Sequence, residues 1–313
     1  MNRPTLPFQP AYRWLESGEL ERRVRSAYQL LEDCVLCARY CHVNRRMGLA
    51  GAVCRTGEKA IVHSYGPHHG EEEPLRGWAG SGTIFFSGCN LRCVFCQNWE
   101  ISQQRIGEEV EPEAIAAMML ELQHAGCHNI NLVSPSHVVA QILAAVRVAV
   151  EGGLDLPIVY NTGGYDSPEA LALLDGVIDI YMPDMKYGDS ATAHRYSHVR
   201  DYCEVNQVCI GEMHRQVGDL IVDERGIARR GLLIRHLVLP ANLANTEKVL
   251  SFIAREISPN TYLNLMAQYY PCYRADQYPP LDRSITREEY QRALSLAAHF
   301  GLKRLDNPAQ QRR

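Results

Sequence analysis

Short β-rich runs alternate with amphipathic helical segments along this chain from Ser81 onward, and this alternation constrains the fold more than any other feature. Residues 83–86, 129–133, 157–160, 178–182, 233–239 and 262–266 have the composition of buried strands. Helical spacing of apolar residues marks 113–125, 137–150 and 246–257, and a last helix opens with Thr286 and Glu289 as a capping box. A turn at 223–226 predicts a hairpin inserted before the fifth strand.

Six strand–helix units in succession predict an α/β fold with a parallel sheet and right-handed crossovers. A closed barrel needs eight such units, so we expect a partial (β/α)6 TIM-like barrel whose open side admits a large substrate. The length of 313 residues fits one barrel with an appendage. The predicted domains are an N-terminal arm and Cys-rich metal-binding cap over 1–80, the barrel over 81–305, and a polar tail over 306–313. We expect an extended arm over 1–20, a helix over 19–32 and a loop over 66–82.

The composition excludes several classes of protein. The chain is 46% hydrophobic and carries 32 Lys and Arg against 36 Asp and Glu, which is typical of a soluble globular protein. This balance argues against a disordered chain and against nucleic-acid binding through bulk positive charge. The longest apolar run is too short to span a bilayer, and the N-terminus lacks the apolar region of a secretory signal. We therefore predict a cytoplasmic protein with no membrane or nucleic-acid partner.

Cysteine is unusually frequent, with 11 residues, and seven of these fall in two groups. The N-terminal group is Cys34, Cys37, Cys41 and Cys54, and the cluster-loop group is Cys89, Cys93 and Cys96. Clustered thiols in a reducing compartment indicate metal binding rather than disulfides. The four isolated cysteines receive no predicted role, because isolated cysteines usually behave as small buried apolar residues.

Residues 81–98, SGTIFFSGCNLRCVFCQN, carry the strongest signal. The first predicted strand ends at Phe86, Gly88 permits a sharp turn, and the spacing C-x3-C-x2-C follows at the end of the strand where barrel enzymes place their chemistry. Three thiolates on a four-iron cubane leave one iron open, which is typical of a reacting site. The alternative is a zinc site with His124 or His128 as a remote fourth ligand.

With Phe95 before its third cysteine, this motif resembles that of the radical S-adenosylmethionine (SAM) enzymes. The resemblance implies a [4Fe–4S] cluster whose open iron is chelated by the amino and carboxylate groups of SAM. It further implies that one electron cleaves SAM to methionine and a 5′-deoxyadenosyl radical, which abstracts a hydrogen atom from the substrate. In such an enzyme the protein supplies binding, orientation and exclusion of solvent.

Polar residues at the other strand ends narrow the resemblance. Asp184-x-Lys186 after the fourth strand and Arg235 on the fifth match, by type and order, SAM-contacting residues of the pyruvate formate-lyase-activating type, which activates glycyl-radical enzymes. Over about residues 81–270 the chain resembles a branch related to those activases. It departs from them at two places: 134–136 reads Ser-Pro-Ser instead of a Gly-Gly-Glu-like segment, and Gln268 stands where a histidine is usual. The predicted cofactor-binding residues are Phe95, Asn98, Ser134, Ser136, Asn161, Asp184, Lys186 and Arg235.

The N-terminal group supplies four thiols, enough to saturate a tetrahedral zinc or a cubane. Such a closed site would staple 30–60 together, or act as an auxiliary cluster that passes electrons or holds substrate; His42 could replace one cysteine. The arginines at 39, 45, 46 and 55 could favour thiolates or steer an acidic electron donor such as flavodoxin or ferredoxin. The loop at 68–74 could place its Glu and His residues over the cluster, or be an exposed acidic loop.

The favoured function is therefore a radical SAM oxidoreductase that activates a glycyl-radical enzyme by abstracting a hydrogen atom from a glycine Cα. One alternative keeps the chemistry and changes the substrate to a small molecule or a non-glycyl peptide. The other is a zinc-stapled binding protein without redox chemistry.

Overall fold

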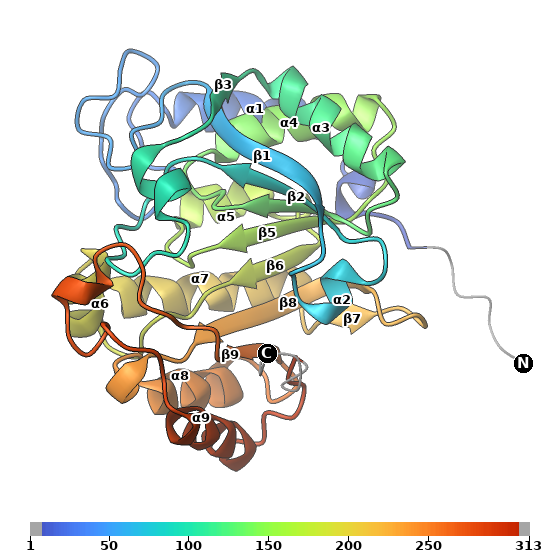
Figure 1. The fold of residues 1–313 in the computed structure, drawn as a ribbon. Coiled ribbons are helices and arrows are strands. Elements are labelled where there is room, and N and C mark those ends of the chain that lie inside the picture. The colour runs from blue at the N-terminus through green and yellow to red at the C-terminus, as the bar shows by residue number, and fades with distance from the viewer. Residues whose placement is uncertain (1–7, 307–313) are drawn as a thin grey trace, which may run out of the picture.

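The computed structural model describes residues 8–306, and its strands in that range form one sheet (Figure 1). Six neighbouring strands run parallel in chain order. They are β2 (Ser81–Phe86), β4 (Ile130–Val133), β5 (Ile158–Thr162), β6 (Ile180–Pro183), β8 (Ala228–Leu237) and β9 (Tyr262–Met266). The predicted α/β class and parallel sheet are confirmed, and the six strands match the six predicted ones. Closure of these strands into a partial barrel stays a prediction.

Antiparallel strands extend this sheet. β1 (Ala60–His68) pairs with β2 and with β3 (Glu108–Val110), and β7 (Ile221–Val222) forms the predicted hairpin with β8. The predicted loop over 66–82 is wrong, because it contains the end of β1 and the short helix α2 (Glu73–Arg76). Pro67 is tolerated in β1 because β3 pairs only with residues 60–62, so the far side of the strand needs no N–H donor there. The sheet thus crosses the predicted domain boundary at residue 80.

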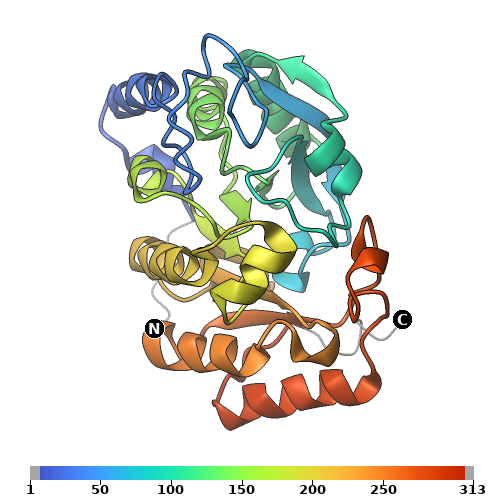
Figure 2. The ribbon, with the colours of Figure 1, turned by 90° about the vertical axis from the view of Figure 1, so that its left-hand side faces the viewer.

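The helices pack against one another along one face of the curved sheet, as Figure 2 shows. Along the chain they are α1 (Glu19–Gln29), α3 (Pro112–His124), α4 (Val139–Glu151), α5 (Pro168–Leu174), α6 (Ser190–Ser197), α7 (Tyr202–Val217), α8 (Thr246–Phe252) and α9 (Arg287–His299). The predicted helices correspond to α1, α3, α4, α8 and α9. The capping box is present: the Thr286 side chain accepts from the Glu289 N–H, and the Glu289 carboxylate accepts from the Thr286 N–H.

Sequence patterns missed α5, α6 and α7. α7 buries Asn206 and Gln216 on the same face as Ile210, so its apolar period is interrupted by polar residues. α8 ends at Phe252 and continues as a wider π-helical turn over Ile253–Ile257. The predicted arm begins in residues 1–7, which lie outside the described range, and includes a 3-10 turn at Ala11–Trp14. The predicted C-terminal tail lies outside it too, apart from Asp306.

Candidate active site

The cluster loop, residues 87–98, follows the carboxyl end of β2. The carboxyl ends of the parallel strands face the viewer in Figure 2. Gly88 has a φ of 85°, and a Cβ on it would lie 2.9 Å from the Cys54 carbonyl oxygen, so only glycine fits this turn. The end of α6 holds the loop from the other side. The Val94 N–H donates to the Tyr196 carbonyl at 2.8 Å, and the Arg92 N–H donates to the Ser197 carbonyl at 3.3 Å. The loop backbone is therefore fixed before any ligand binds.

The three cluster-loop thiols line one cavity. Cys93 Sγ lies 2.9 Å from Ser197 Oγ, and Cys96 Sγ lies 3.2 Å from Ser102 Oγ. Burial raises the pKa of Cys89 to about 12 and that of Cys96 to about 11. These two thiols therefore hold their protons at neutral pH until a metal displaces them.

The donor set fits a cubane better than a single metal ion. Within residues 8–306, no three His, Cys, Asp or Glu side chains have the arrangement that one ion needs. In a [4Fe–4S] cluster each thiolate binds its own iron, so the sulfurs need not converge on one point. The structure does not bring His124 or His128 to the thiols, because both precede β4 and the cluster loop follows the parallel strand β2, at the opposite end of these strands.

The cavity that the thiols line has a volume of about 370 Å³. It lies at the carboxyl ends of the parallel strands, where open α/β sheets bind their ligands. Phe95 lines an adjoining cavity of about 220 Å³ together with Cys93, Cys96 and Lys186. The other predicted cofactor-binding residues all line the main cavity, namely Asn98, Ser134, Ser136, Asn161, Asp184, Lys186 and Arg235. The fold thus brings the predicted set together, and its role in binding SAM stays a prediction.

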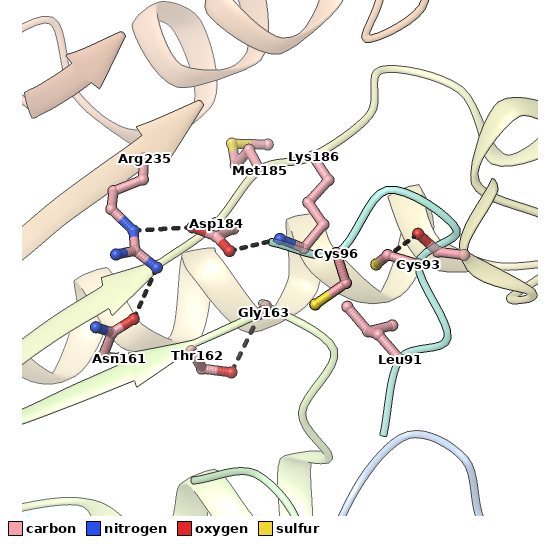
Figure 3. Close-up of polar contacts among 12 residues, drawn as sticks. Leu91, Cys93, Cys96, Asn161, Thr162, Gly163, Asp184, Met185, Lys186 and Arg235 are labelled. Carbon is pink, nitrogen blue, oxygen red and sulfur yellow. Dashed lines mark hydrogen bonds and ion pairs between the residues drawn. The ribbon is translucent and has the colours of Figure 1, made fainter. Parts of the chain in front are cut away.

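A charged network crosses the cavity floor beside the thiols (Figure 3). One carboxylate oxygen of Asp184 accepts from Lys186 Nζ at 2.6 Å and the other from Arg235 Nε at 2.8 Å. Arg235 Nη2 also donates to the Asn161 side-chain carbonyl at 2.7 Å. Burial alone would raise the pKa of Asp184, but the charges of Arg235 and Lys186 outweigh it and lower that pKa. Asp184 is therefore a carboxylate that holds two cations in fixed positions.

Ser134 and Ser136 differ in how they are held. Ser134 has a φ of 59°, an uncommon conformation for a residue with a side chain. The Ser136 hydroxyl lies 2.9 Å from Thr162 Oγ1, which donates to the buried Asp166 carboxylate at 2.7 Å. The strand end at 134–136 is thus bound to the strand end of β5 through side chains.

Two carboxyl groups in the cavity come from outside the parallel strands. Glu71 and Glu72 lie between β1 and α2, and both line the cavity with the thiols. Glu72 accepts from the Asn264 amide at 2.9 Å. The Glu71 side chain is only 9% exposed, and its burial together with the Glu72 charge raises the pKa of Glu71 to about 8. Of the two interpretations of this loop, the structure favours the one near the cluster loop, because Glu71, Glu72 and also His68 line the cavity of its thiols.

Sequence reasoning missed Asn264, although a signal for it existed. A polar residue inside an apolar strand, as in Leu263-Asn264-Leu265, marks a strand face that meets a cavity instead of the core. Asn131 in β4 follows the same pattern, between Ile130 and Leu132, and is fully buried.

Comparisons with known proteins agree with this site. The family model of the Radical SAM superfamily matches residues 83–207, from within β2 to within α7. "Uncharacterized protein MJ0674" of Methanocaldococcus jannaschii is 33% identical over 296 residues, which is 92% of this chain and 81% of that protein.

Two solved structures are similar at lower identity. A radical SAM methyltransferase from Sphaerobacter thermophilus is 14% identical, with a TM-score of 0.46 over 70% of this chain and 64% of that one. SuiB of Streptococcus suis, bound to the precursor peptide SuiA, is 10% identical, with a TM-score of 0.46 over 68% of this chain and 44% of that one.

The matched segment contains the cluster loop and four of the six parallel strand ends that form the cavity. Membership implies an enzyme that cleaves SAM at an iron–sulfur cluster, so a zinc-stapled protein without redox chemistry is not retained. Because the family model matches the cluster-loop segment and a 33% identical relative aligns with 92% of this chain, this chain belongs to the radical SAM superfamily.

Proposed function

We propose that the enzyme directs its radical to a substrate with a basic or hydrogen-bond-donating group, which docks against Glu71 and Glu72. Such a substrate is a small molecule or a non-glycyl peptide that carries this group. The observation that carries it is the pair of carboxyl groups in the cavity of the cluster-loop thiols. A buried carboxyl group whose pKa is raised to about 8 gains most from a partner that is a cation or a strong donor.

The chain's own residues have distinct tasks in this reaction. When bound, the cluster supplies the electron that splits SAM and so generates the hydrogen-abstracting radical. Cys89, Cys93 and Cys96 would hold that cluster at the carboxyl end of β2. Asp184 fixes Lys186 and Arg235, so that cationic donors face the cavity without a change of geometry during the reaction.

The test measures 5′-deoxyadenosine formed by the reconstituted enzyme with lysine, arginine or a basic peptide as probes. We expect these probes to stimulate its formation and neutral or acidic analogues to leave it unchanged. Glu72→Gln should remove the stimulation and leave the basal, uncoupled cleavage intact. Glu73→Gln is the matched control, because this neighbouring carboxylate is exposed and outside the cavity lining. Equal stimulation by acidic probes contradicts the proposal.

Activation of a glycyl-radical enzyme is the second candidate. Asp184, Lys186 and Arg235 favour it, because they form one network in the order expected for the pyruvate formate-lyase-activating type. In that case, anaerobic incubation with a glycyl-radical enzyme such as pyruvate formate-lyase gives a glycyl radical signal in electron paramagnetic resonance (EPR). If SAM is cleaved but no such signal forms, this candidate fails.

The proposal also includes an electron donor, a second metal, a partial barrel and a cellular compartment. A low-potential flavodoxin or ferredoxin donates the electron, and the N-terminal group binds a second metal, as zinc or as a cluster, within a Cys-rich cap. The six parallel strands form a partial barrel. The cytoplasm is the compartment in which the 11 cysteines, all unpaired as thiols in the structure, would stay reduced. Among residues 8–306, no helix combines the length and hydropathy needed to cross a bilayer.

A further inference from the structure

The four thiols of the N-terminal group lie in a segment without a helix or extended strand between α1 and β1. Cys34, Cys37 and Cys54 are buried at 5%, 7% and 6% exposure, and Cys41 is partly exposed. Burial raises the pKa of Cys37, and the nearby sulfurs of Cys54, Cys34 and Cys41 raise it further, so the four cysteines lie close to one another. Because this segment lacks a regular hydrogen-bond ladder, the shared site needs another source of order.

A buried arginine lies beside these thiols. Arg45 is 2% exposed, and its guanidinium donates to the Thr56 carbonyl at 2.7 Å and the Gly57 carbonyl at 3.2 Å. Its Nη1 lies 3.6 Å from Cys34 Sγ, and its charge also interacts with Cys54. In the described part of the chain, no carboxylate pairs with Arg45. A buried cation needs a compensating anion, and four thiolates around a metal centre supply one.

The neighbouring charged side chains have partners elsewhere. His42 pairs with Asp33 at 3.0 Å, on an exposed face, so its ring is engaged outside the thiol site. Exposed Arg46 is bound by Glu32 and Glu58. The site therefore consists of four thiols and one guanidinium. Its thiols also lack the convergence that a single ion requires, which favours a cubane over zinc.

The segment that carries the N-terminal group is hydrogen-bonded to the cluster loop. The Cys54 carbonyl packs against Gly88, and the preceding carbonyl, that of Val53, accepts from Arg92 of the loop. In the other direction, Arg39 Nε donates to the Asn90 carbonyl at 2.6 Å. The charge of Arg92 interacts with Cys89 and with Cys54. Residues adjoining the two thiol groups are thus connected by short bonded and hydrogen-bonded paths.

We propose that the N-terminal group binds a second [4Fe–4S] cluster, that Arg45 balances its charge, and that it exchanges electrons with the cluster-loop site. The electron role rests on the proposed function. A low-potential one-electron donor is oxidised at the second cluster. The same electron is finally consumed in breaking the carbon–sulfur bond of SAM, so one donor is oxidised for each SAM reduced.

The first experiment separates the two sites by iron and sulfide content after anaerobic reconstitution. The wild type should hold two cubanes. The variant Cys89→Ala/Cys93→Ala/Cys96→Ala should retain about four irons and about four sulfides per chain, with an EPR signal of the reduced protein that SAM does not change. A variant with all four N-terminal cysteines replaced by Ala should retain about four irons whose EPR signal SAM does change. Cys41→Ser, at the partly exposed ligand, tests the same loss if the quadruple variant fails to fold.

The outcomes distinguish this inference from the proposed function. If the cluster-loop variant holds zinc or no metal, the second cluster is contradicted. SAM-sensitive iron in the wild type would then still support the cluster-loop site. If the wild type lacks any SAM-sensitive EPR signal, the proposed function fails instead.

The second experiment tests the electron role by freeze-quench EPR. With reduced flavodoxin as donor, loss of the N-terminal group should slow reduction of the SAM-sensitive cluster by about tenfold or more. Cys127→Ala is the control, because this isolated buried cysteine precedes β4 at the opposite end of the strands. A reduction rate equal to that of the control overturns the electron role.

Discussion

The two cysteine groups lie side by side but have opposite surroundings. The cluster-loop group has three thiols, and they open onto a polar cavity that also contains a nearly buried carboxyl group, Glu71. The N-terminal group has four thiols, three of them buried, and the buried guanidinium of Arg45 contacts Cys34. An open, three-thiol site is suited to a ligand that reacts, and a closed, four-thiol site to one that stays bound.

The buried ionisable side chain at each site indicates which kind of ligand the site can bind. The carboxyl group of Glu71 is costly to ionise and is stabilised by a cation or a hydrogen-bond donor, whereas the buried guanidinium of Arg45 is stabilised by an anion. A cysteine group near a buried ionisable residue therefore suits a different ligand at each site. Four changes test this contrast, and they follow from the largest expected effect to the smallest.

Cys93→Ala should abolish reductive SAM cleavage, a loss of more than about a thousandfold, because two thiols cannot hold the cubane at the cavity. The corresponding change in the other group, Cys34→Ala, should leave SAM bound and cleaved when dithionite is the reductant. The measurement is 5′-deoxyadenosine by chromatography. If Cys93→Ala still forms it, the assignment of the cluster loop is wrong.

Asp184→Ala should weaken SAM binding by about 10- to 100-fold, because Lys186 and Arg235 lose the carboxylate that orients them. Two partly buried cations without their partner should also lower the free energy of unfolding by about 1–3 kcal/mol. Calorimetric titration with SAM and urea denaturation measure the two effects. Asp155→Ala is the control, since Asp155 is exposed in a surface pair with Arg13. An unchanged SAM affinity removes Asp184 from the site.

Arg45→Met should lower the iron affinity of the N-terminal group by about 10- to 100-fold and leave the SAM-sensitive iron unchanged. In the metal-free protein the same change removes a buried charge without a carboxylate partner but also the hydrogen bonds to the Thr56 and Gly57 carbonyls, so the urea midpoint should move little. Iron content and the urea midpoint measure these effects, with exposed Arg46→Met as control. Full iron occupancy in Arg45→Met would show that charge balance is unnecessary.

Glu71 should make stability depend on pH. Its folded-state pKa of about 8 lies above the unfolded value of about 4.3, so the folded protein holds the extra proton between these values. The stability it contributes is complete below the unfolded pKa and is lost as the pH rises through about 8. Burial and Glu72 raise this pKa, whereas Arg235 lowers it, and His68 lies 3.6 Å away.

Glu71→Gln should therefore be more stable than the wild type at high pH and should show a flatter profile. Urea midpoints at several pH values between about 5 and 9 measure this, with Glu73→Gln as control. Equal pH slopes for wild type and Glu71→Gln contradict the placement of Glu71 as a buried acid.

Short β-rich apolar runs were sufficient for the six parallel strands, whose central members are buried on both faces, and the 3.6-residue period was sufficient for five helices, which bury one face. They failed for β1 and α7. β1 contains Gly66 and Pro67, which suit it only because one of its sides is an edge there. α7 buries Asn206, whose amide donates to the carbonyls of Gly164 and Asp184, partners distant in the sequence.

The sequence by itself determined the chemistry of the cluster loop, because three thiols at C-x3-C-x2-C after a strand are local along the chain. It also placed Asp184, Lys186 and Arg235 at strand ends, because parallel strands end at one edge. Only the tertiary structure decided that Glu71 and Glu72 enter the cavity, that Arg45 is buried beside the N-terminal group, and that this group lies against the cluster loop. Burial and pairing arise between segments that approach each other only after folding, and no local pattern encodes them.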